Sequence, residues 1–410
     1  MLFDPARHEA LAGEPWSEPA ARRAIGAIVK AACDAFDARS LWPVHRRDTD
    51  EADALLPNPM LYHGAAGVIW ALRHLQRLGM ADVPIDFGAT IATLPEHSRR
   101  CPAALESDRY SYLLGNAGIL LLQWKHGCDP AVADALYHVV EANLENPTLE
   151  ALWGSPGTLV AALHMLDDEG AADQHLRWSA LLRRGAETLY AQMHAARHST
   201  QPEREVWLWT QDMYGRQFDY LGAGHGFAGN VYPVLRGARW LDDELVRRFE
   251  ARTEQTLAGT ALHEGGQVNW DAWFDPAARG YPHRPLVQDC HGAPGIICRL
   301  VDTRSAVLRD LLLRGGELIW AAAPLNKAPG LCHGTDGNAY AFLKLHALTG
   351  EARWLERARA FAMHAVVQSD AEAAKHGMRR YSLWTGDLGL AVSLASCINA
   401  DPAFPTFDVF

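Results

Sequence analysis

The most regular feature of the hydrophobic pattern is a short apolar run that follows a Gly-x-x-Gly pair and recurs seven times. The pairs begin at Gly64, Gly115, Gly154, Gly226, Gly292, Gly334 and Gly386. After Gly67 the chain reads VIWAL, and after Gly337 it reads NAYAFL. Such runs are apolar nearly all round, and their Ala and Leu content favours buried helices over parallel strands. A pattern that recurs this often indicates an internal repeat.

Amphipathic stretches separate these apolar runs. Between Arg353 and Ala362, for example, apolar and charged residues fall on opposite helical faces. The chain therefore alternates a polar-backed outer helix with an apolar inner helix. Seven such pairs, closed on themselves, predict an all-α fold of the α/α-toroid type, a double ring of seven inner and seven outer helices in a single domain over residues 1–410. Each Gly pair would begin an inner helix at one end of the ring, where small residues permit tight turns near a ligand.

The spacing between successive pairs is uneven, at 51, 39, 72, 66, 42 and 52 residues. The two long intervals must hold extra material, and residues 195–220 and 263–289 are the candidates. The second of these carries Trp270, Trp273 and Phe274 among Gly and Pro residues. Long loops in compact domains are often lids, although a surface excursion without a function fits equally well.

Composition and charge narrow the class of protein. Hydrophobic residues make up 49% of the 410 positions and charged residues 21%, as in globular proteins. The net charge of −11 argues against nucleic acid or an anionic membrane as the main partner, because both require clustered Lys and Arg. The first residues show no signal-peptide pattern, and no segment approaches 18 continuous apolar residues. We therefore expect a cytoplasmic protein with no membrane span.

The seven cysteines are an odd and scattered set, which is not typical of a disulfide framework. Free buried thiols or metal ligands fit better. Cys298 and Cys397 lie inside apolar runs and are expected in the core. A lone cysteine is most often a small buried hydrophobe.

Histidines precede four of the Gly pairs, and two of them follow a cysteine. They are His63, His225, His291 and His333. The two Cys-His pairs are Cys290-His291 and Cys332-His333, which hold the same place in their repeats. If all Gly pairs lie at one end of a ring, these side chains converge there. Thiols and imidazoles are the ligands that zinc prefers, so the repeat register suggests a zinc site even though the local spacing is a modest signal.

Five segments resemble those of a known family. They read YLGAGHGFAGN at 220–230, VQDCHGAPG at 287–295, GLCHGTDGNAYAFL at 330–343, YSLWTGDLG at 381–389 and FPTFDVF at the end of the chain. Together they resemble the lanthionine synthetase C-like proteins, including the glutathione-binding branch. The resemblance covers essentially the whole chain, because the seven-fold repeat matches the double ring of that family. The two Cys-His-Gly motifs are its most specific elements.

The resemblance implies a zinc ion held by Cys290, Cys332 and His333. It also implies that His225 is the acid–base residue over the metal and that His291 faces the same site. The glutathione-binding branch has a histidine at the position of His291, where the bacterial cyclases can have tyrosine.

Further positions follow from the same resemblance. Glu150, four residues before Gly154, matches an acidic position of the cyclases. Lys327 and Arg379 match basic positions of the glutathione-binding branch and would bind substrate. Asp289 departs from the pattern, since the family usually has tryptophan before the first cysteine ligand. An extra carboxylate beside the metal could alter its charge or its ligand set.

The chemistry of these residue types supports thiol activation independently. A free thiol with a pKa near 8.5 is only about 3% thiolate at pH 7, whereas binding to a metal deprotonates it. A thiolate suits attack on the β-carbon of dehydroalanine or dehydrobutyrine, and a histidine suits protonation of the resulting enolate. Ligation by three histidines, or by two histidines and a glutamate, would instead favour hydrolysis by zinc-bound water.

The expected function is therefore zinc-dependent thioether formation, in which glutathione adds to a dehydroamino acid of a peptide or protein. Lys327, Arg379 and His291 favour glutathione over the alternative thiol, a cysteine of a precursor peptide, which would make the protein a lanthipeptide cyclase. A non-catalytic protein that binds zinc and glutathione is a further alternative. A glycosidase would need paired carboxylates across a cleft. Glu150 and two aspartates, Asp289 and Asp336, could be offered, but they leave the Cys-His pairs unexplained.

Overall fold

The computed structural model describes residues 1–48, 57–103 and 106–410. Within these residues the chain forms fourteen α-helices, five short 3-10 helices and six short β-strands, which confirms the predicted all-α class. Contacts divide the chain into two compact units. The first unit comprises residues 1–5, 110–112 and 134–322, and the second comprises residues 6–109, 113–133 and 323–410. A single domain over residues 1–410 stays a prediction, and each unit is described by itself below.

Seven helices begin directly after the first glycine of a Gly pair, and we call them the Gly-capped helices. They are α2 (Ala65–Arg77), α4 (Asn116–Gly127), α6 (Ser155–Leu166), α8 (Phe227–Arg236), α10 (Ala293–Leu300), α12 (Thr335–Thr349) and α14 (Asp387–Asn399). Every residue of α6 and α10 is buried. The prediction that these apolar runs are buried helices is therefore confirmed.

Backbone conformation and lack of space explain glycine in the pairs that begin at Gly226 and Gly292. Gly226 and Gly292 cap their helices with φ of 116° and 97°, a region that other residues rarely adopt. At the second position the reason is space, because a Cβ on Gly295 would lie 1.7 Å from the carbonyl oxygen of Asp289. The loop before the helix therefore folds back onto the first helical turn.

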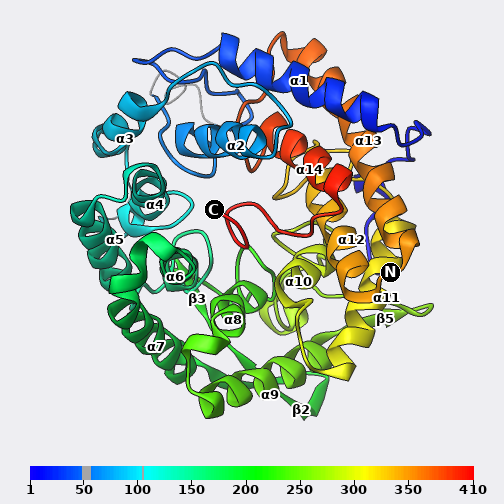
Figure 1. Ribbon diagram of the computed structural model, residues 1–410. Helices are drawn as coiled ribbons and strands as arrows, with labels where there is room; N and C mark the ends of the chain where they lie inside the picture. Colours follow the sequence, from blue (N-terminus) through cyan, green and yellow to red (C-terminus); the bar gives the residue numbers. More distant parts are fainter. Residues whose placement is uncertain (49–56, 104–105) are drawn as a thin grey trace. The chain divides into compact units, whose positions relative to one another are not determined.

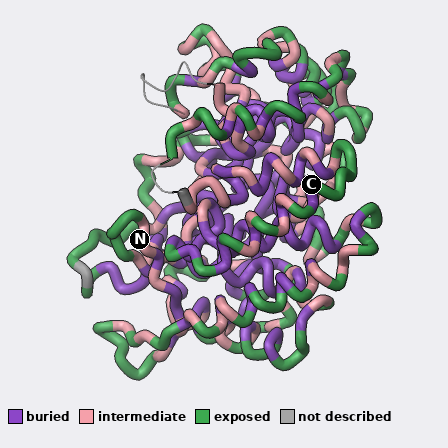
Figure 2. Tube along the Cα trace, turned by 90° about the vertical axis from the view of Figure 1, so that its left-hand side faces the viewer, coloured by how far each residue is buried: buried purple, intermediate pink, exposed green. Residues whose placement is uncertain are grey.

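The other seven helices alternate with the Gly-capped helices along the chain. They are α1 (Glu18–Asp34), α3 (Gly88–Arg100), α5 (Pro130–Ala142), α7 (His175–Gln192), α9 (Asp243–Thr260), α11 (Ala306–Ala322) and α13 (Ala352–His376). In α13, Trp354, Ala358 and Phe361 are buried while Arg353 and Glu356 are exposed, as expected of an amphipathic helix. Figure 2 shows the same alternation, with buried stretches of the trace separated by exposed ones.

Gly-capped helices pack against one another in repeat order within each unit (Figure 1). In the first unit α8 contacts both α6 and α10, and in the second unit α14 contacts both α12 and α2, which in turn contacts α4. Amphipathic helices cover them, as α7 covers α6 and α13 covers α12. The repeat seen in the sequence is therefore also a repeat of helix packing.

The two long intervals fold into β-hairpins, all of them in the first unit. Their strands are β1 (His194–His198), β2 (Gln201–Leu208), β3 (Gln211–Met213), β4 (Arg216–Phe218), β5 (Leu262–Glu264) and β6 (Gln267–Asn269). Each strand pairs antiparallel with its sequence neighbour, as β1–β2, β3–β4 and β5–β6. The predicted extra material is thus present. The strands themselves were not predicted, because β1 and the start of β2 are polar and largely exposed and show no apolar alternation.

Short 3-10 helices complete the description. They are η1 (Pro5–Arg7), η2 (Glu106–Tyr110), η3 (Glu169–Gln174), η4 (Ala238–Trp240) and η5 (Pro276–Arg279).

All seven cysteines lie in the described residues and are free thiols, and Cys298 and Cys397 are buried in the core as predicted. Among the described helices, none combines the length and the apolar character needed to cross a membrane.

Candidate functional site

Backbone hydrogen bonds join the loops that precede the Gly-capped helices. In the second unit the N–H of Cys332 donates to the carbonyl of Trp384 at 3.0 Å, and the N–H of Trp384 donates to the carbonyl of Tyr62 at 3.3 Å. Tyr62 in turn donates to the carbonyl of Leu113 at 2.9 Å. All four residues lie two positions before the first glycine of their pair. The loops therefore stack in repeat order, and Cys332 is one member of this ladder.

The first unit contains the same ladder. The N–H of Gly224 donates to the carbonyl of Cys290 at 3.1 Å, and the N–H of Ala151 donates to the carbonyl of Gly224 at 3.2 Å. Cys290 is 6% exposed and Cys332 is 5% exposed. The two cysteines therefore hold equivalent places, each buried and each in the ladder of its own unit.

A fully buried carboxylate holds His225. The Nδ1 atom of His225 lies 2.9 Å from Oε2 of Glu150, whose side chain is 0% exposed. The same carboxylate accepts backbone N–H bonds from Leu152 and Trp153. Because these N–H groups make the carboxylate an acceptor, Nδ1 of His225 is the nitrogen that donates to it. The opposite nitrogen, Nε2, is then the one that can exchange a proton with a ligand, and the side chain is 23% exposed.

His291 lies beside His225 and is more deeply buried. The two imidazole centroids are 5.5 Å apart, and the ring of Tyr220 lies 5.2 Å from His291 and 5.9 Å from His225. Burial, helped by the charges of His225 and Arg284, lowers the pKa of His291 well below its usual value. His291 is therefore neutral at pH 7, so His225 is the better placed of the two to act as an acid.

Two glycines and a glutamine shape the surroundings of Cys290. A Cβ on Gly224 would lie 2.7 Å from the Cβ of Cys290, and a Cβ on Gly222 would lie 2.9 Å from Nδ1 of His291. The side-chain amide of Gln288 donates a hydrogen bond to Sγ of Cys290 at 2.9 Å. A donor aimed at the sulfur suits a thiolate better than a thiol.

The carboxylate of Asp289 forms a buried ion pair with Arg299. Oδ2 of Asp289 accepts a hydrogen bond from Nη2 of Arg299 at 3.1 Å, and both side chains are 1% exposed. The charge of Asp289 is thus paired with that of Arg299, and its effect on the metal or the ligand set stays a prediction. The departure from the usual tryptophan is accommodated by a charge pair inside the first unit.

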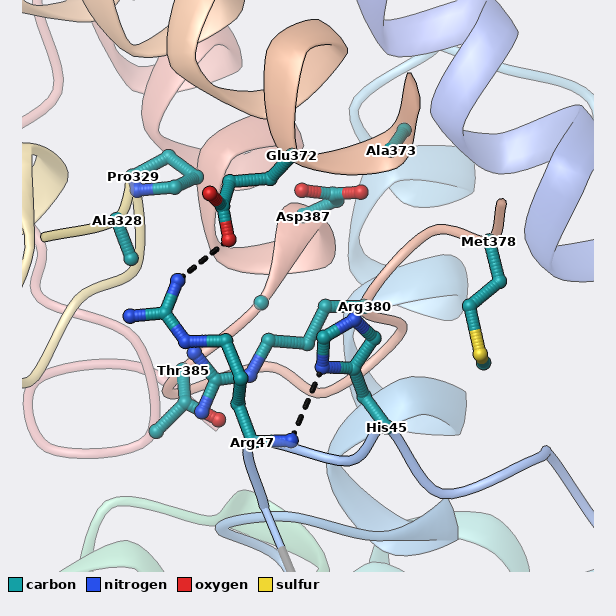
Figure 3. Close-up of a pocket in the computed structure, with 11 residues that line it drawn as sticks. His45, Arg47, Ala328, Pro329, Glu372, Ala373, Met378, Arg380, Thr385 and Asp387 are labelled. Carbon is teal, nitrogen blue, oxygen red and sulfur yellow. Dashed lines mark hydrogen bonds and ion pairs between the residues drawn. The ribbon is translucent and has the colours of Figure 1, made fainter. Parts of the chain in front are cut away.

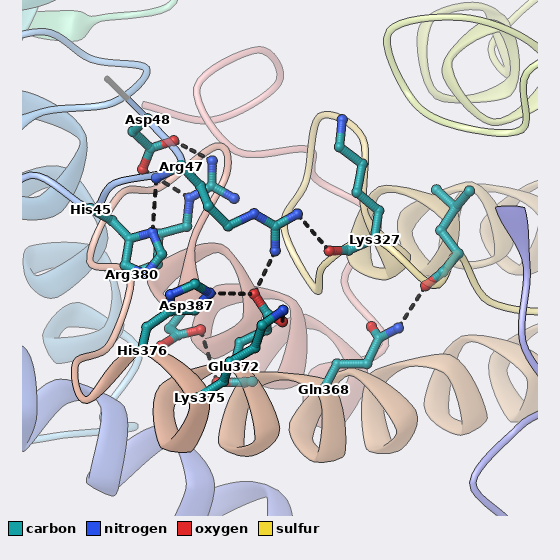
Figure 4. A network of polar contacts seen from close by, with 12 residues as sticks. His45, Arg47, Asp48, Lys327, Gln368, Glu372, Lys375, His376, Arg380 and Asp387 are labelled. Atoms are coloured by element: carbon teal, nitrogen blue, oxygen red, sulfur yellow. Dashed lines mark hydrogen bonds and ion pairs between the residues drawn. The ribbon is translucent and has the colours of Figure 1, made fainter. Parts of the chain in front are cut away.

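In the second unit the carboxylate of Asp48 contacts two loops, the one that holds His63 and the one that holds residues 380–385. The side chain of Asp48 is 2% exposed and accepts hydrogen bonds from Arg380, Thr385 and Ser382, with Thr385 Oγ1 at 2.7 Å. Figure 4 shows the contact with Arg380, whose Nε lies 2.8 Å from the carboxylate. His63 Nδ1 lies 3.2 Å from it. Burial alone would raise the pKa of Asp48, but the bonds and charges of Arg380 and His63 lower it far below its usual value.

This carboxylate supports the ladder around Cys332. The residues that it holds flank Trp384 and Tyr62, whose backbones carry the hydrogen bonds next to Cys332. His63 was predicted to converge with the other histidines, which stays a prediction. In the structure its ring lies beside the carboxylate of Asp48. His333 follows Cys332 directly and is half-buried at the start of α12.

Lys327 is exposed, and Arg47 contacts its backbone. Nη2 of Arg47 donates to the carbonyl of Lys327 at 2.8 Å, while Nη1 of Arg47 pairs with Glu372 of α13 at 2.5 Å. Figure 4 shows these contacts as one network that links residue 47, the loop of Lys327 and α13. Arg47 thereby fixes the backbone from which the ammonium group of Lys327 extends.

Arg379 is bound within the second unit. Its guanidinium donates to Ser369 Oγ at 2.9 Å and to Asp370 Oδ1 at 2.8 Å, and it lies 3.5 Å from Asp387 Oδ2. Its side chain is 19% exposed. A substrate carboxylate would therefore have to replace one of these partners. Of the two predicted substrate-binding cations, Lys327 is the more exposed.

A small pocket of the second unit is lined by residues that neighbour these two cations in sequence or by contact (Figure 3). It is lined by His45, Arg47, Ala328, Pro329, Glu372, Ala373, Met378, Arg380, Thr385, Gly386 and Asp387. Ala328 follows Lys327 directly, and Asp387 is the partner of Arg379. Its charged lining residues, Arg47 and Arg380 with Glu372 and Asp387, balance in charge, and the rest of the lining is largely apolar.

The predicted zinc ligands are divided between the two units. Cys290 belongs to the first unit, whereas Cys332 and His333 belong to the second. Within the described parts of the chain, no group of three or more His, Cys, Asp and Glu side chains gathers closely enough to hold a metal ion. The donor chemistry nonetheless fits zinc, since two thiols and an imidazole are its preferred ligands and Cys290 accepts a hydrogen bond from Gln288. The ligand set stays a prediction.

Several residues near Cys290 and Cys332 were not predicted from the sequence. Gly222 and Gly224 stand close together in YLGAGHG, and this spacing could have indicated a close approach of another chain segment. Gln288 and Arg299 carry no such signal, because an isolated Gln or Arg has many functions. Asp48 lies outside every repeat, and its partner Arg380 is more than 300 residues away.

Two known proteins are similar in sequence to about half of this chain. Glutathione S-transferase LANCL1 of Danio rerio is 31% identical over 202 residues, which is 47% of this chain and 47% of that protein. LanC-like protein GCL1 of Arabidopsis thaliana is 28% identical over 201 residues, which is 46% of this chain and 43% of that protein. The chain thus spans about half the length of the curated relatives that it matches.

A solved structure and a family model extend the comparison to most of the chain. The structure of nisin cyclase aligns with a TM-score of 0.57 at 16% identity, covering 83% of this chain and 89% of that one, and this likeness confirms the predicted α/α-toroid fold. The family model described as lanthionine synthetase C-like protein matches residues 57–409. Because that match takes in all seven Gly pairs and both Cys-His-Gly motifs, the chain belongs to the lanthionine synthetase C-like protein family.

Proposed function

We propose that this protein catalyses the zinc-dependent addition of glutathione to dehydroalanine or dehydrobutyrine in a peptide or protein, forming a thioether. The observation that carries the proposal is the pairing of His225 with the buried carboxylate of Glu150. His225 follows Gly224, whose backbone N–H donates a hydrogen bond to the carbonyl of Cys290. The names of the relatives, a glutathione S-transferase and a nisin cyclase, support a thiol as the nucleophile. The cytoplasm, where glutathione is reduced, is the compartment that we expect.

The reaction needs a nucleophilic sulfur and a proton for carbon. Cys290, Cys332 and His333 would hold the metal, and zinc bound to two thiolates and an imidazole would favour the thiolate form of an incoming thiol. The sulfur bonds to the β-carbon, and the π electrons of the carbon–carbon double bond move to the α-carbon. One proton leaves the thiol and one proton reaches the α-carbon, so the product is a simple adduct without any redox change.

His225 is the residue that we assign to the second proton. Glu150 accepts the hydrogen bond from Nδ1 and stabilises the protonated imidazole, which then donates from Nε2. His291 packs against this ring and stays neutral because burial lowers its pKa, so it lines the site without competing for the proton. A histidine that is oriented by a buried carboxylate is a common arrangement for proton transfer.

Charge favours glutathione over an uncharged thiol at the second unit. Glutathione carries two carboxylates, and Lys327 offers an exposed ammonium group to one of them. Arg379 could bind the other only in exchange for Asp370 or Asp387. We therefore expect Lys327 to contribute to binding directly and Arg379 to contribute after a local rearrangement.

The double replacement of Lys327 and Arg379 by alanine should raise the KM for glutathione by about 10- to 100-fold. Each charged hydrogen bond contributes about 1.5–3 kcal/mol, and water that solvates the exposed groups offsets part of this binding energy. Turnover of 2-mercaptoethanol, an uncharged thiol, should change little. The measurement is the KM for each thiol with the same dehydroalanine peptide. The variant Lys375→Ala, which removes an exposed lysine from α13, is the matched control. Equal losses with both thiols would contradict a role in carboxylate binding.

The proposal as a whole is tested by mass spectrometry after the purified protein is incubated with glutathione and a dehydroalanine peptide. We expect an adduct of one glutathione per dehydroalanine, formed faster than without protein, and about one zinc per chain by elemental analysis. Zinc without any adduct would favour a non-catalytic protein that binds zinc and glutathione. Reaction only with a cysteine in the same peptide would favour a lanthipeptide cyclase.

A further inference from the structure

Six aromatic side chains of the first unit are connected through the imidazole of His225, and we call them the aromatic surface. Its members are Trp153, Tyr214, Phe218, Tyr220, Trp273 and Tyr281. They come from three separate segments: the loop before α6, the β3–β4 hairpin with the residues that follow it, and the segment after β6. The second and third of these lie in the two intervals that exceed the length of an ordinary repeat.

Ring contacts divide the members into two sets. In the first set Trp153 lies 6.4 Å from Tyr214. In the second set Tyr220 lies 4.8 Å from Phe218 and 6.0 Å from Trp273. Tyr281 completes this second set at 5.3 Å from Trp273 and 6.0 Å from Phe218.

The imidazole of His225 joins the two sets. Its ring is stacked on Trp153 at 6.0 Å with an interplanar angle of 24°, and the ring of Tyr220 lies 5.9 Å away. The group that we assign as the acid is therefore in contact with members of both sets of rings. Any acceptor whose α-carbon reaches His225 brings its neighbouring residues close to these rings.

Two members of the surface are exposed although they are large and aromatic. Tyr214 is 50% exposed and Tyr281 is 37% exposed. Exposed large hydrophobic residues elsewhere in the described chain, such as Leu176 and Val307, are not part of such a ring cluster. Aromatic rings that gather at the surface of a protein commonly mark a binding site, because their apolar faces gain free energy when a ligand covers them.

We propose that the aromatic surface binds the apolar side chains that flank the dehydroamino acid in the acceptor peptide, and so selects acceptors by their neighbouring residues. This inference rests on the proposed function. Glutathione carries no apolar side chain for these six rings to cover, so the acceptor is the substrate that matches them. The charge of Arg284 acts on Tyr220 and His291, and the six rings themselves contribute none. An extended peptide places the residues on either side of the reacting one within a few ångströms, a span that the rings around His225 can cover.

The two exposed tyrosines allow a direct test. Tyr214 has a φ of 56°, so Tyr214→Asn removes the ring and keeps a residue that tolerates this backbone conformation. Tyr281→Ala removes the second ring. The acceptors are two dehydroalanine peptides that differ only in the flanking residues, Leu and Phe in one and Ser and Gly in the other. N-acetyl-dehydroalanine methyl amide serves as a minimal acceptor without neighbours.

We expect each variant to raise the KM for the Leu/Phe peptide about three- to tenfold, as the loss of one aromatic contact predicts. Turnover of the minimal acceptor should stay unchanged, and the Ser/Gly peptide should be affected little. The control is Leu176→Ala, which removes an exposed apolar side chain from α7 of the same unit. Thermal melting accompanies each measurement, because a purely structural role would lower stability and change all three acceptors equally.

Two outcomes would overturn the inference. One is an equal KM of the unaltered protein for the Leu/Phe and the Ser/Gly peptides. The other is a loss in the variants that includes the minimal acceptor. If no acceptor reacts at all, the proposed function fails, and the surface is then tested by tryptophan fluorescence with the Leu/Phe peptide that carries alanine in place of dehydroalanine. Tight binding that the variants weaken would still support the surface, and absence of binding would remove it.

Discussion

Replacing His225 with asparagine should lower the rate of thioether formation by about 100- to 10,000-fold, the range expected for loss of a general acid. Asparagine keeps a polar side chain at this position but has no group that donates a proton to carbon near pH 7. Zinc content and fold should be retained, because His225 is not among the predicted ligands. The measurement is turnover of a dehydroalanine peptide, with elemental analysis and thermal melting on the same preparation.

Two variants separate catalysis from packing in this prediction. His63 has the same place in its own repeat but lies beside Asp48, so His63→Asn should cost stability without a large loss of rate per folded molecule. Glu150→Gln should lower the rate less than His225→Asn, because it removes the carboxylate that orients and stabilises the imidazole while leaving the imidazole in place. A His225→Asn protein that loses its zinc would instead make His225 a ligand, and the function of His333 would need revision.

Replacing Cys332 with alanine should abolish most of the zinc binding and, with it, most of the activity. Two remaining ligands hold zinc poorly, and a predicted site of two thiolates and one imidazole loses a charge as well as a bond. We expect the zinc content to fall from about one per chain to a small fraction of that value. Elemental analysis after dialysis against a weak chelator gives this value directly, and competition with a fluorescent zinc chelator gives the affinity.

The matched control for this variant is Cys397→Ala. Cys397 is also a buried thiol of the second unit, but it lies inside α14, where burial raises its pKa well above the usual value of a thiol, and it is not a predicted metal ligand. This variant should lower stability by about 1 kcal/mol through the small cavity that it leaves, and it should keep its zinc. Full retention of zinc in Cys332→Ala would show that the ligand set is wrong.

Family membership, the proposal of glutathione and the proposal of an apolar acceptor rest on different observations. Membership of the lanthionine synthetase C-like family rests on a match over residues 57–409. The proposal of glutathione rests on charge at Lys327, and the proposal of an apolar acceptor rests on rings near His225. Because these two features lie in different units and use different forces, their variants should affect the KM values for different substrates.

The sequence by itself determined the helices and their repeat. Each Gly-capped helix was predicted because an apolar run that follows a recurring Gly pair is a local signal. The same signal placed Cys290 and Cys332 at equivalent positions, and both enter the backbone ladder of their units. Burial of Cys298 and Cys397 followed from the same pattern.

Tertiary structure alone decided which charged groups meet. Glu150 and His225 are 75 residues apart, and Asp48 and Arg380 are 332 residues apart, so no local pattern could pair them. Arg379 was predicted to bind substrate, yet its partners in the structure are acidic residues of its own unit. The physical reason is that helix formation and burial depend on neighbours in sequence, whereas ion pairs and ring contacts depend on the directions in which side chains point after distant loops have been brought together.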